Sequence, residues 1–180
     1  MQGSGLTIDG VEPNPEWSEM ARPLYRNFYP TTVEGAHLPD GTYDAIVCAD
    51  VLEHLPDPLT VLKQLVKAAK PGATFLISLP NIANWSIRLM LLAGYFPKME
   101  KGILDRTHLQ FLTQDTASDL LKSAGLTIEK ITPTGIPVEE VWKGGENNPL
   151  FKFVQGTQNL ALDWFPRLAG YQWIFVARRP

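Results

Sequence analysis

A carboxylate stands directly after a short apolar run near the start of the chain. Glu12 follows Leu6–Val11, and Asn14 and Pro15 come two and three positions later. An acidic side chain at the carboxyl end of a parallel strand can accept hydrogen bonds from both vicinal hydroxyls of a ribose. Asn14 suits an N-cap and Pro15 the first residue of a helix. The segment predicts a strand, a ribose-binding acid and a helix; the alternative is a solvated loop acid beside the helix dipole.

Two histidines are the candidate bases, because imidazole titrates near neutral pH. His54 comes a few residues after an apolar run, and His108 ends the polar group that begins at Asp105. We expect Asp105 to pair with His108 and to orient its ring. The alternatives are that His54 packs the start of the next helix, and that residues 105–108 fix their segment to a sheet.

Glu53 and His54 together offer a carboxylate and an imidazole, which are both metal ligands. Two adjacent residues do not make a site, so the sequence interpretation assigns no metal.

The composition indicates an ordinary globular protein. The chain has 180 residues, of which 44% are hydrophobic and 19% charged, so we expect a single domain over residues 1–180. A net charge of −3 without a basic run argues against a nucleic-acid partner. The longest apolar stretch is interrupted by Arg88 and Gly94 and is too short for a membrane span. One cysteine, Cys48, and no signal sequence favour the cytoplasm. We expect Cys48 to be a buried small hydrophobic residue.

Strand-like and helix-like segments alternate along the chain. The expected strands are Leu6–Val11, Tyr43–Ala49, Thr74–Leu79, Leu126–Ile131 and Tyr171–Arg178, with a weak one at 31–33. The expected helices lie at about 15–21, 57–70, 82–96 and 113–125, and residues 133–168 are expected to be irregular or mixed. This alternation predicts an α/β fold with a mostly parallel sheet and helices on both faces. The last two strands have no confident helix between them, so the final strand could run antiparallel.

Four segments in this order resemble the class I S-adenosylmethionine-dependent methyltransferases, in the branch that includes the ubiquinone-type O-methyltransferases. They are Val11–Asn14, Leu38–Asp44, Asp50–Pro58 and Leu104–Thr113. Each segment alone is weak evidence, whereas four in the right order over residues 6–132 are strong. The resemblance implies a Rossmann-like, doubly wound fold, S-adenosyl-L-methionine as cofactor and a small-molecule acceptor. Some relatives in this branch are metal-dependent.

The resemblance also assigns roles to residues. Glu12 would bind the ribose hydroxyls. For methyl transfer, the chemistry of the side chains makes His54 and His108 the candidate bases and Asp105 the residue that orients His108. The remaining cofactor contacts would come from Pro13, Gly35 and Ala36 near the adenine and from Ala49, Asp50 and Val51 beside the methionine part.

The chain departs from the family where the first strand and its glycine-rich turn should stand, because neither has a counterpart. That strand is normally central in the sheet, and its absence would expose a strand edge. We therefore expect an N-terminally truncated methyltransferase with impaired cofactor binding. It would cover the bare edge by forming a homodimer or by sliding its strands together.

Residues 82–112 are expected to form a lid-like insertion. Trp85, Tyr95 and Phe96 would cover the active site and line an apolar acceptor pocket. The alternative is plain core packing. The same two interpretations apply to Trp142, Phe151, Phe153, Trp164 and Phe165, and residues 143–148 are expected to form a surface loop.

Two functional hypotheses follow. The first is methyl transfer to a small-molecule oxygen, with nitrogen or carbon less favoured. The second is a non-catalytic methyltransferase-like interaction module. A nicotinamide-dependent oxidoreductase is a distant third, because Glu12 alone would allow it but the segments around His54 and His108 would not.

Overall fold

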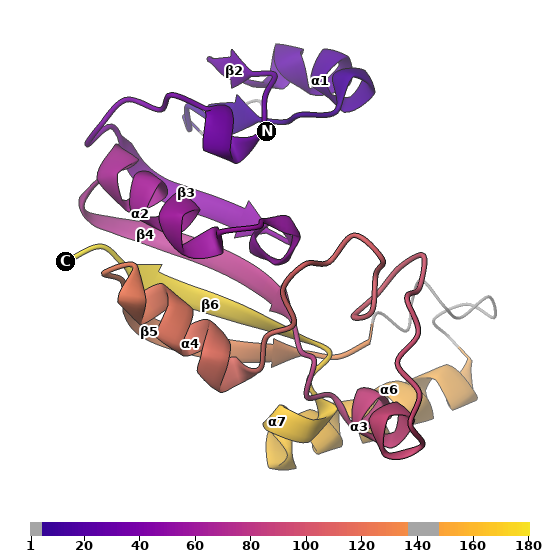
Figure 1. The fold of residues 1–180 in the computed structure, drawn as a ribbon. Helices are drawn as coiled ribbons and strands as arrows, with labels where there is room; N and C mark the ends of the chain where they lie inside the picture. Colours follow the sequence, from indigo (N-terminus) through magenta and orange to yellow (C-terminus); the bar gives the residue numbers. More distant parts are fainter. Residues whose placement is uncertain (1–4, 137–147) are drawn as a thin grey trace. The chain divides into compact units, whose positions relative to one another are not determined.

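The computed structural model describes residues 5–136 and 148–180, without the side chains of 149–151. It divides into two compact units, Met1–Pro39 and Asp40–Pro180, here called the N-terminal and C-terminal units. Figure 1 shows the elements of each unit. Trp142 and the predicted surface loop, except its last residue, lie outside the described residues, as does the side chain of Phe151.

The N-terminal unit is a small parallel strand pair joined by a helix. Strands β1 (Gly10–Val11) and β2 (Phe28–Tyr29) pair in parallel, and α1 (Pro15–Ala21) and the 3-10 turn η1 (Arg22–Leu24) connect them. The predicted helix at 15–21 is confirmed. β1 is shorter than expected, and the second strand forms at 28–29 instead of 31–33.

Asp9 holds the two strands of this unit together. Its side chain is 4% exposed and accepts hydrogen bonds from Arg26 Nε (3.0 Å), Arg26 Nη2 (2.9 Å) and the Asn27 backbone N–H (3.2 Å). A buried carboxylate is stable only when it is paired and hydrogen-bonded in this way. The register of β1 against β2 therefore depends on Asp9.

The spacing of Trp17, Met20, Ala21 and Leu24 in the sequence predicts that these residues form the buried face of α1, and this prediction is wrong. Trp17, Met20 and Leu24 are 62%, 77% and 73% exposed, whereas Ser18 is buried and donates a hydrogen bond to the Glu12 carbonyl. A pair of two-residue strands presents too little surface to cover an apolar helix face.

The C-terminal unit contains a four-stranded sheet in the order β3-β4-β6-β5. β3 (Tyr43–Ala49) and β4 (Ala69–Pro80) are parallel, and β6 (Gln172–Arg178) runs antiparallel to both β4 and β5 (Thr127–Thr134). β3, β4 and β5 therefore share one direction. The mostly parallel α/β sheet with an antiparallel final strand is confirmed.

Helices cover one face of this sheet. The crossovers through α2 (Pro58–Ala68) and α4 (Gln114–Ser123) both advance from β3 towards β5, so right-handed connections place both helices on the same side. The two helices contact each other. The core between these helices and the sheet contains the buried residues Leu62, Leu65, Phe75, Ile77, Leu121, Trp173 and Phe175.

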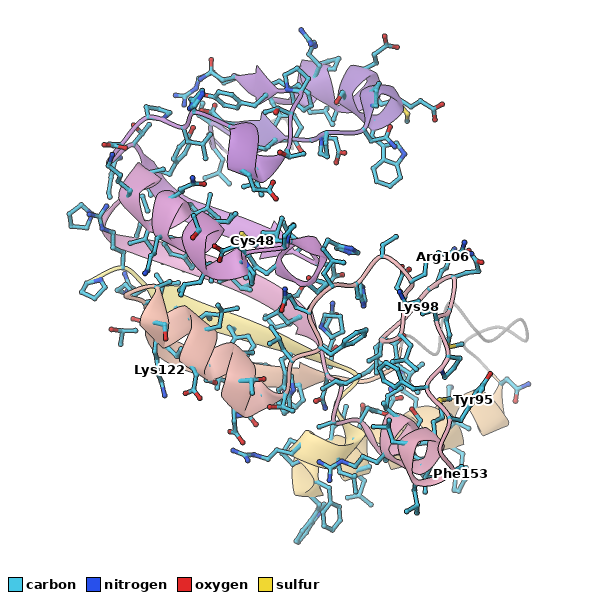
Figure 2. The ribbon with its side chains drawn as sticks, in the orientation of Figure 1. Cys48, Tyr95, Lys98, Arg106, Lys122 and Phe153 are labelled. Atoms are coloured by element: carbon cyan, nitrogen blue, oxygen red, sulfur yellow. The ribbon has the colours of Figure 1, made fainter. Side chains whose placement is uncertain are left out.

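The other face of the sheet is open in part. Val47 is 64% and Leu76 41% exposed, so α2 and α4 leave this face partly uncovered within the C-terminal unit. The reason is the common direction of the two crossovers. Cys48 points to the covered face, where burial raises the pKa of its thiol to about 12, which confirms the buried-hydrophobe interpretation (Figure 2).

Three further described helices, α3 (Trp85–Leu92), α6 (Pro149–Trp164) and α7 (Pro166–Ala169), do not belong to the layer that α2 and α4 form on the sheet. α3 is shorter than the predicted 82–96, and Ile87 packs with Ile103 and Leu104 in a small second core. α6 and α7 form where an irregular region was expected. Among the described helices, none combines the length and apolar character needed to cross a membrane.

Candidate functional site

Glu12 stands at the carboxyl end of β1 with part of its carboxylate available. Glu12 Oε1 accepts a hydrogen bond from the Asn14 backbone N–H (2.8 Å), and the Glu12 backbone N–H donates to Tyr29 (3.1 Å). Asn14 in turn caps α1 by accepting from the Glu16 N–H (2.9 Å). No hydrogen bond to Oε2 occurs within the described residues, and the side chain is half-buried. The carboxylate is therefore oriented while one oxygen is left for a ligand.

Gly35 and Ala36 belong to the same unit as Glu12. They end the 3-10 turn η2 (Val33–Gly35), in which the Ala36 N–H donates to the Val33 carbonyl (3.3 Å). A side chain at Gly35 would approach Thr31 Oγ1 to 2.8 Å, so the turn favours glycine. Contact of Gly35, Ala36 and the exposed Pro13 with an adenine stays a prediction.

Asp50 joins the ends of three strands in the C-terminal unit. Its φ of 53° lies in the left-handed region, which asparagine and aspartate tolerate better than most residues. Ser78 Oγ on β4 accepts from the Asp50 N–H (3.0 Å) and donates to Asp50 Oδ1 (2.9 Å). Gln172 at the start of β6 donates to the same oxygen. Asp50 thereby turns the chain sharply between Ala49 and Val51, at the sheet edge where the fold class binds its ligands.

Backbone hydrogen bonds bring two distant segments together beside Asp50. The Glu53 carbonyl, in the 3-10 turn η3 (Leu52–His54), accepts from the N–H groups of Leu109 (2.8 Å) and Gln110 (3.0 Å). The Gln110 side chain also donates to the Leu55 carbonyl (3.1 Å). These contacts place His108 against His54, with ring centroids 4.8 Å apart and an angle of 68° between the rings.

The hydrogen bonds of the two imidazoles define which nitrogen is protonated. His108 Nδ1 lies 3.0 Å from the Ile103 carbonyl, which can only accept, so this nitrogen carries the hydrogen. His54 Nδ1 lies 3.1 Å from Thr107 Oγ1, whose own hydrogen is donated to Asp105 Oδ1 (2.6 Å). His54 Nδ1 is therefore also a donor. Both neutral rings keep an unprotonated Nε2.

The expected pairing of Asp105 with His108 is wrong. Asp105 Oδ1 accepts from both the N–H (2.8 Å) and the hydroxyl of Thr107, which hold the pKa of Asp105 below its ordinary value. A side chain two residues away in the same turn reaches the carboxylate before the imidazole does. Asp105 consequently orients His54 through Thr107.

Glu53 is the least solvated group of the site. It is 1% exposed, and neither carboxylate oxygen has a hydrogen-bond partner within the described residues. Burial, with a smaller contribution from Asp50, raises the pKa of Glu53 to about 8, against the opposing influence of the residue's own backbone N–H. A cavity of about 180 Å³ adjoins it. The cavity is lined by Asp50, Glu53, His54, Pro80, Lys101, Gly102, Ile103, Asp105, His108, Tyr171 and Gln172.

Glu53, His54 and His108 form a group that could hold a divalent cation. Their candidate ligand atoms lie within 4.8 Å of one another. Two imidazoles and one carboxylate suit several transition metals, and ligating histidines usually donate their other nitrogen to a fixed acceptor, as both do here. The sequence interpretation assigned no metal because His108, the third donor, reaches the pair only in the tertiary structure.

Comparison with known proteins supplies the family. Residues 1–131 match the family model described as "Methyltransferase domain". The chain belongs to this methyltransferase family. The resemblance inferred from the four sequence segments is therefore confirmed, and so is the Rossmann-like α/β fold class.

Two relatives carry the name ubiquinone biosynthesis O-methyltransferase. The protein of Aeromonas salmonicida is 31% identical over 132 residues, which cover 69% of this chain and 54% of the relative. The protein of Vibrio parahaemolyticus is 28% identical over 158 residues, covering 82% and 66%. This methyltransferase-family chain thus spans about half to two thirds of the length of these relatives.

Solved structures support the same fold. A SAM-dependent methyltransferase from Archaeoglobus fulgidus superposes with a TM-score of 0.61 at 17% identity. The match covers 95% of this chain and 75% of that protein. At this identity the likeness shows the methyltransferase fold and not the reaction.

Sequence reasoning missed two residues that the structure brings into the site. Glu53 was considered only as half of a metal pair, and Thr107 had no individual role. Both stand in the segments that carry the family resemblance, but nothing in the sequence shows that Glu53 is buried without a partner. The predicted roles of His54, His108 and Asp105 in catalysis stay predictions.

Substituting Glu53 with Gln should change how stability depends on pH. In the folded protein the pKa of Glu53, about 8, lies above the ordinary value of 4.5. The folded form therefore keeps a proton that the unfolded chain releases. The free energy of unfolding consequently falls as pH rises from about 4.5 to about 8. We expect Glu53→Gln to be more stable than the wild type at pH 8 by a few kcal/mol, on the order of the shift times ~1.4 kcal/mol.

The measurement is urea unfolding at several pH values with a chelator present. Glu34→Gln, an exposed acid with an ordinary environment, is the matched control. Parallel curves of the free energy of unfolding for Glu53→Gln and wild type between about pH 5 and about pH 8 would contradict the assignment.

The tautomers of His54 and His108 can be observed directly. Both rings should carry their hydrogen on Nδ1 when neutral, because their partners at that nitrogen accept. Ring-nitrogen chemical shifts from long-range ¹H–¹⁵N NMR distinguish the two forms, and the exposed His37 serves as an internal reference. An Nε2–H form at either ring would show that the hydrogen-bond pattern around Thr107 or Ile103 is not the one in solution.

Proposed function

We propose that this chain carries the site of an S-adenosylmethionine-dependent methyltransferase that methylates a hydroxyl oxygen of a small molecule. The observation that carries the proposal is the convergence of Glu53, His54 and His108 on one cavity at the carboxyl end of β3 and β4. In this fold class ligands bind outside the carboxyl ends of the strands. Membership of the methyltransferase family gives that cavity its reaction class.

The cofactor contacts are proposed residue by residue. Glu12, with Oε2 available, would accept hydrogen bonds from the ribose hydroxyls. Pro13, Gly35 and Ala36 would contact the adenine, and Ala49, Asp50 and Val51 would lie beside the amino-acid part. The fixed left-handed backbone of Asp50 supports this role, because it presents the end of β3 without further rearrangement. When bound, the cofactor supplies an electrophilic methyl group on a sulfonium.

The histidines would remove the proton from the acceptor. His108 is nearly buried and presents Nε2, with Nδ1 held by Ile103. His54 presents Nε2 in the same cavity, held through Thr107 and Asp105. Removing the proton makes the oxygen a better nucleophile for in-line displacement, and a fixed ring reduces the entropy lost on reaching that geometry. Lys101 at the cavity supplies a positive charge for an oxygen that becomes negative.

A divalent cation is compatible with the same cavity. Held by Glu53, His54 and His108, it would supply Lewis-acid polarisation of the acceptor hydroxyl. The names of the two relatives support oxygen as the atom that is methylated.

Substituting Glu12 with Ala tests the proposed cofactor site. Loss of a charged acceptor for two hydroxyls should weaken binding of S-adenosylhomocysteine about ten- to a hundredfold, from the ~1.5–3 kcal/mol of charged hydrogen bonds. Isothermal titration calorimetry measures the affinity. Glu16→Ala, an exposed acid in the first turn of α1, is the matched control and should leave the affinity unchanged.

Two outcomes would contradict the proposal in different ways. Equal affinity of wild type and Glu12→Ala would show that the ribose is bound elsewhere. No heat from the wild type even at roughly millimolar ligand, an affinity weaker than about −4 kcal/mol, would favour the non-catalytic interaction module.

A further inference from the structure

Helix α6 turns its large apolar side chains towards solvent. Phe153, Leu160 and Trp164 are 67%, 60% and 72% exposed, and their spacing of seven and four positions puts them on one helix face. These three residues are called the outer stripe below. Surface helices of globular proteins normally bury such a stripe. Phe153, labelled in Figure 2, lies near one end of this stripe.

The orientation of α6 is fixed by its polar side. Gln158 accepts a hydrogen bond from the Ile136 N–H (3.1 Å) and donates one to the Ile136 carbonyl (3.1 Å). Gln158 lies on the opposite face from the outer stripe, because five residues of α-helix from Phe153 correspond to a rotation of about 140°. Within the part of the chain that is described, the stripe therefore cannot turn inward without breaking both bonds.

A notch interrupts the outer stripe at its middle. Gly156 lies between Phe153 and Leu160 along the helix, and a Cβ placed there would meet nothing within 4 Å. Helix axes approach to about 8 Å only where the side chains at the crossing are small. The notch therefore accepts a side chain from another helix.

Two opposite charges flank the stripe on the same side. Lys152 and Asp163 are exposed and lie three turns apart, and neither forms an ion pair within the described residues. Their midpoint falls between Thr157 and Gln158. When two such helices pack antiparallel about a two-fold axis at that midpoint, the same flank of each helix faces its partner. Lys152 of one copy then meets Asp163 of the other, twice.

The apolar residues repeat this self-complementarity. The same axis places Leu160 of one copy about 1.5 Å, along the helix, from the level of the Gly156 notch of the other, and Phe153 about 3 Å from the level of Trp164. A two-fold interface requires that one surface complement itself, and α6 meets this requirement in both charge and shape. A parallel two-fold arrangement would instead put this flank of the two helices on opposite sides of the interface, so Lys152 could not pair with Asp163.

We propose that α6 is the interface of a homodimer in which a second copy of this chain packs antiparallel on the outer stripe. The charges favour a second copy over an anionic lipid surface, because Asp163 balances Lys152 and leaves the rim of the stripe neutral. Four aromatic side chains bury about 600–1,000 Å² at ~150–250 Å² each, which is below the ~1,200–2,000 Å² of stable interfaces and corresponds to a weak dimer.

Charge reversal tests the pairing. Sedimentation velocity of the full 180-residue chain over roughly 1–100 μM should show a monomer–dimer equilibrium. Lys152→Asp and Asp163→Lys each place like charges opposite one another at two symmetric positions. Each should raise the dissociation constant about tenfold or more. The double variant restores both pairs and should dimerise like the wild type.

A mixture of the two single variants is the most discriminating experiment. One copy then carries two acids and the other two lysines, so both contacts are attractive and a heterodimer forms from two weakly associating proteins. Because recovery requires folded α6 in both variants, misfolding cannot produce it. Leu160→Ser should weaken the dimer, and Leu92→Ser on α3, where Leu92 is 84% exposed, should not.

Three results would overturn the proposal. The first is a monomer throughout the concentration range. The second is a dimer that is indifferent to both charge reversals and to Leu160→Ser. The third is a monomer that sediments with phosphatidylglycerol vesicles and loses that binding in Leu160→Ser, which would assign the outer stripe to a lipid surface.

Discussion

The carbonyl of Glu53 accepts two backbone hydrogen bonds, from Leu109 and Gln110, and the candidate site depends on this contact. It joins the turn after β3 to a segment that follows a long excursion through α3. Without this contact both N–H groups would lose their backbone partner, and that of the half-buried Gln110 would be the more costly to leave unpaired. The contact thus holds two histidines from separate segments within ring-stacking distance.

The same contact explains why the buried Glu53 carboxylate has no hydrogen-bond partner among the described residues. The Glu53 backbone faces residues 109–110, so its side chain must point to the other side, into the buried space beside His54 and His108. The resulting rise in its pKa destabilises the fold at neutral pH. A buried acid that lowers the stability of the fold is a candidate for function, because an exposed carboxylate would serve the structure equally well without that loss of stability. A methyltransferase can use the arrangement either for a proton or for a cation.

Polar side chains that no sequence motif singles out position the candidate functional side chains. Asp9 fixes the strand pair that ends in Glu12, and Thr107 links Asp105 to the ring of His54. Ser78 and Gln172 hold Asp50 in its left-handed conformation. The fold class brings strand ends together, but these side chains decide the orientation of each functional group. For this reason membership of the methyltransferase family indicates the cofactor class more readily than the acceptor.

Local physical chemistry let the sequence determine the elements with short-range signals. Asn14 and Pro15 start α1, Asp57 and Pro58 start α2, and Thr113 caps α4, because capping acts within a few residues. Buried apolar runs likewise predicted β3, β4 and β6. The order of four short segments predicted the family.

Tertiary structure alone decided what depends on distant partners. The sequence could not show that α1 exposes Trp17, that α6 is a helix with its apolar side outward, or that Asp105 serves His54 instead of His108. Nor could it show that Glu53, His54 and His108 meet. A residue's neighbours along the chain determine its backbone conformation, whereas its burial and its hydrogen-bond partners are set by segments that approach it only after the sheet has formed.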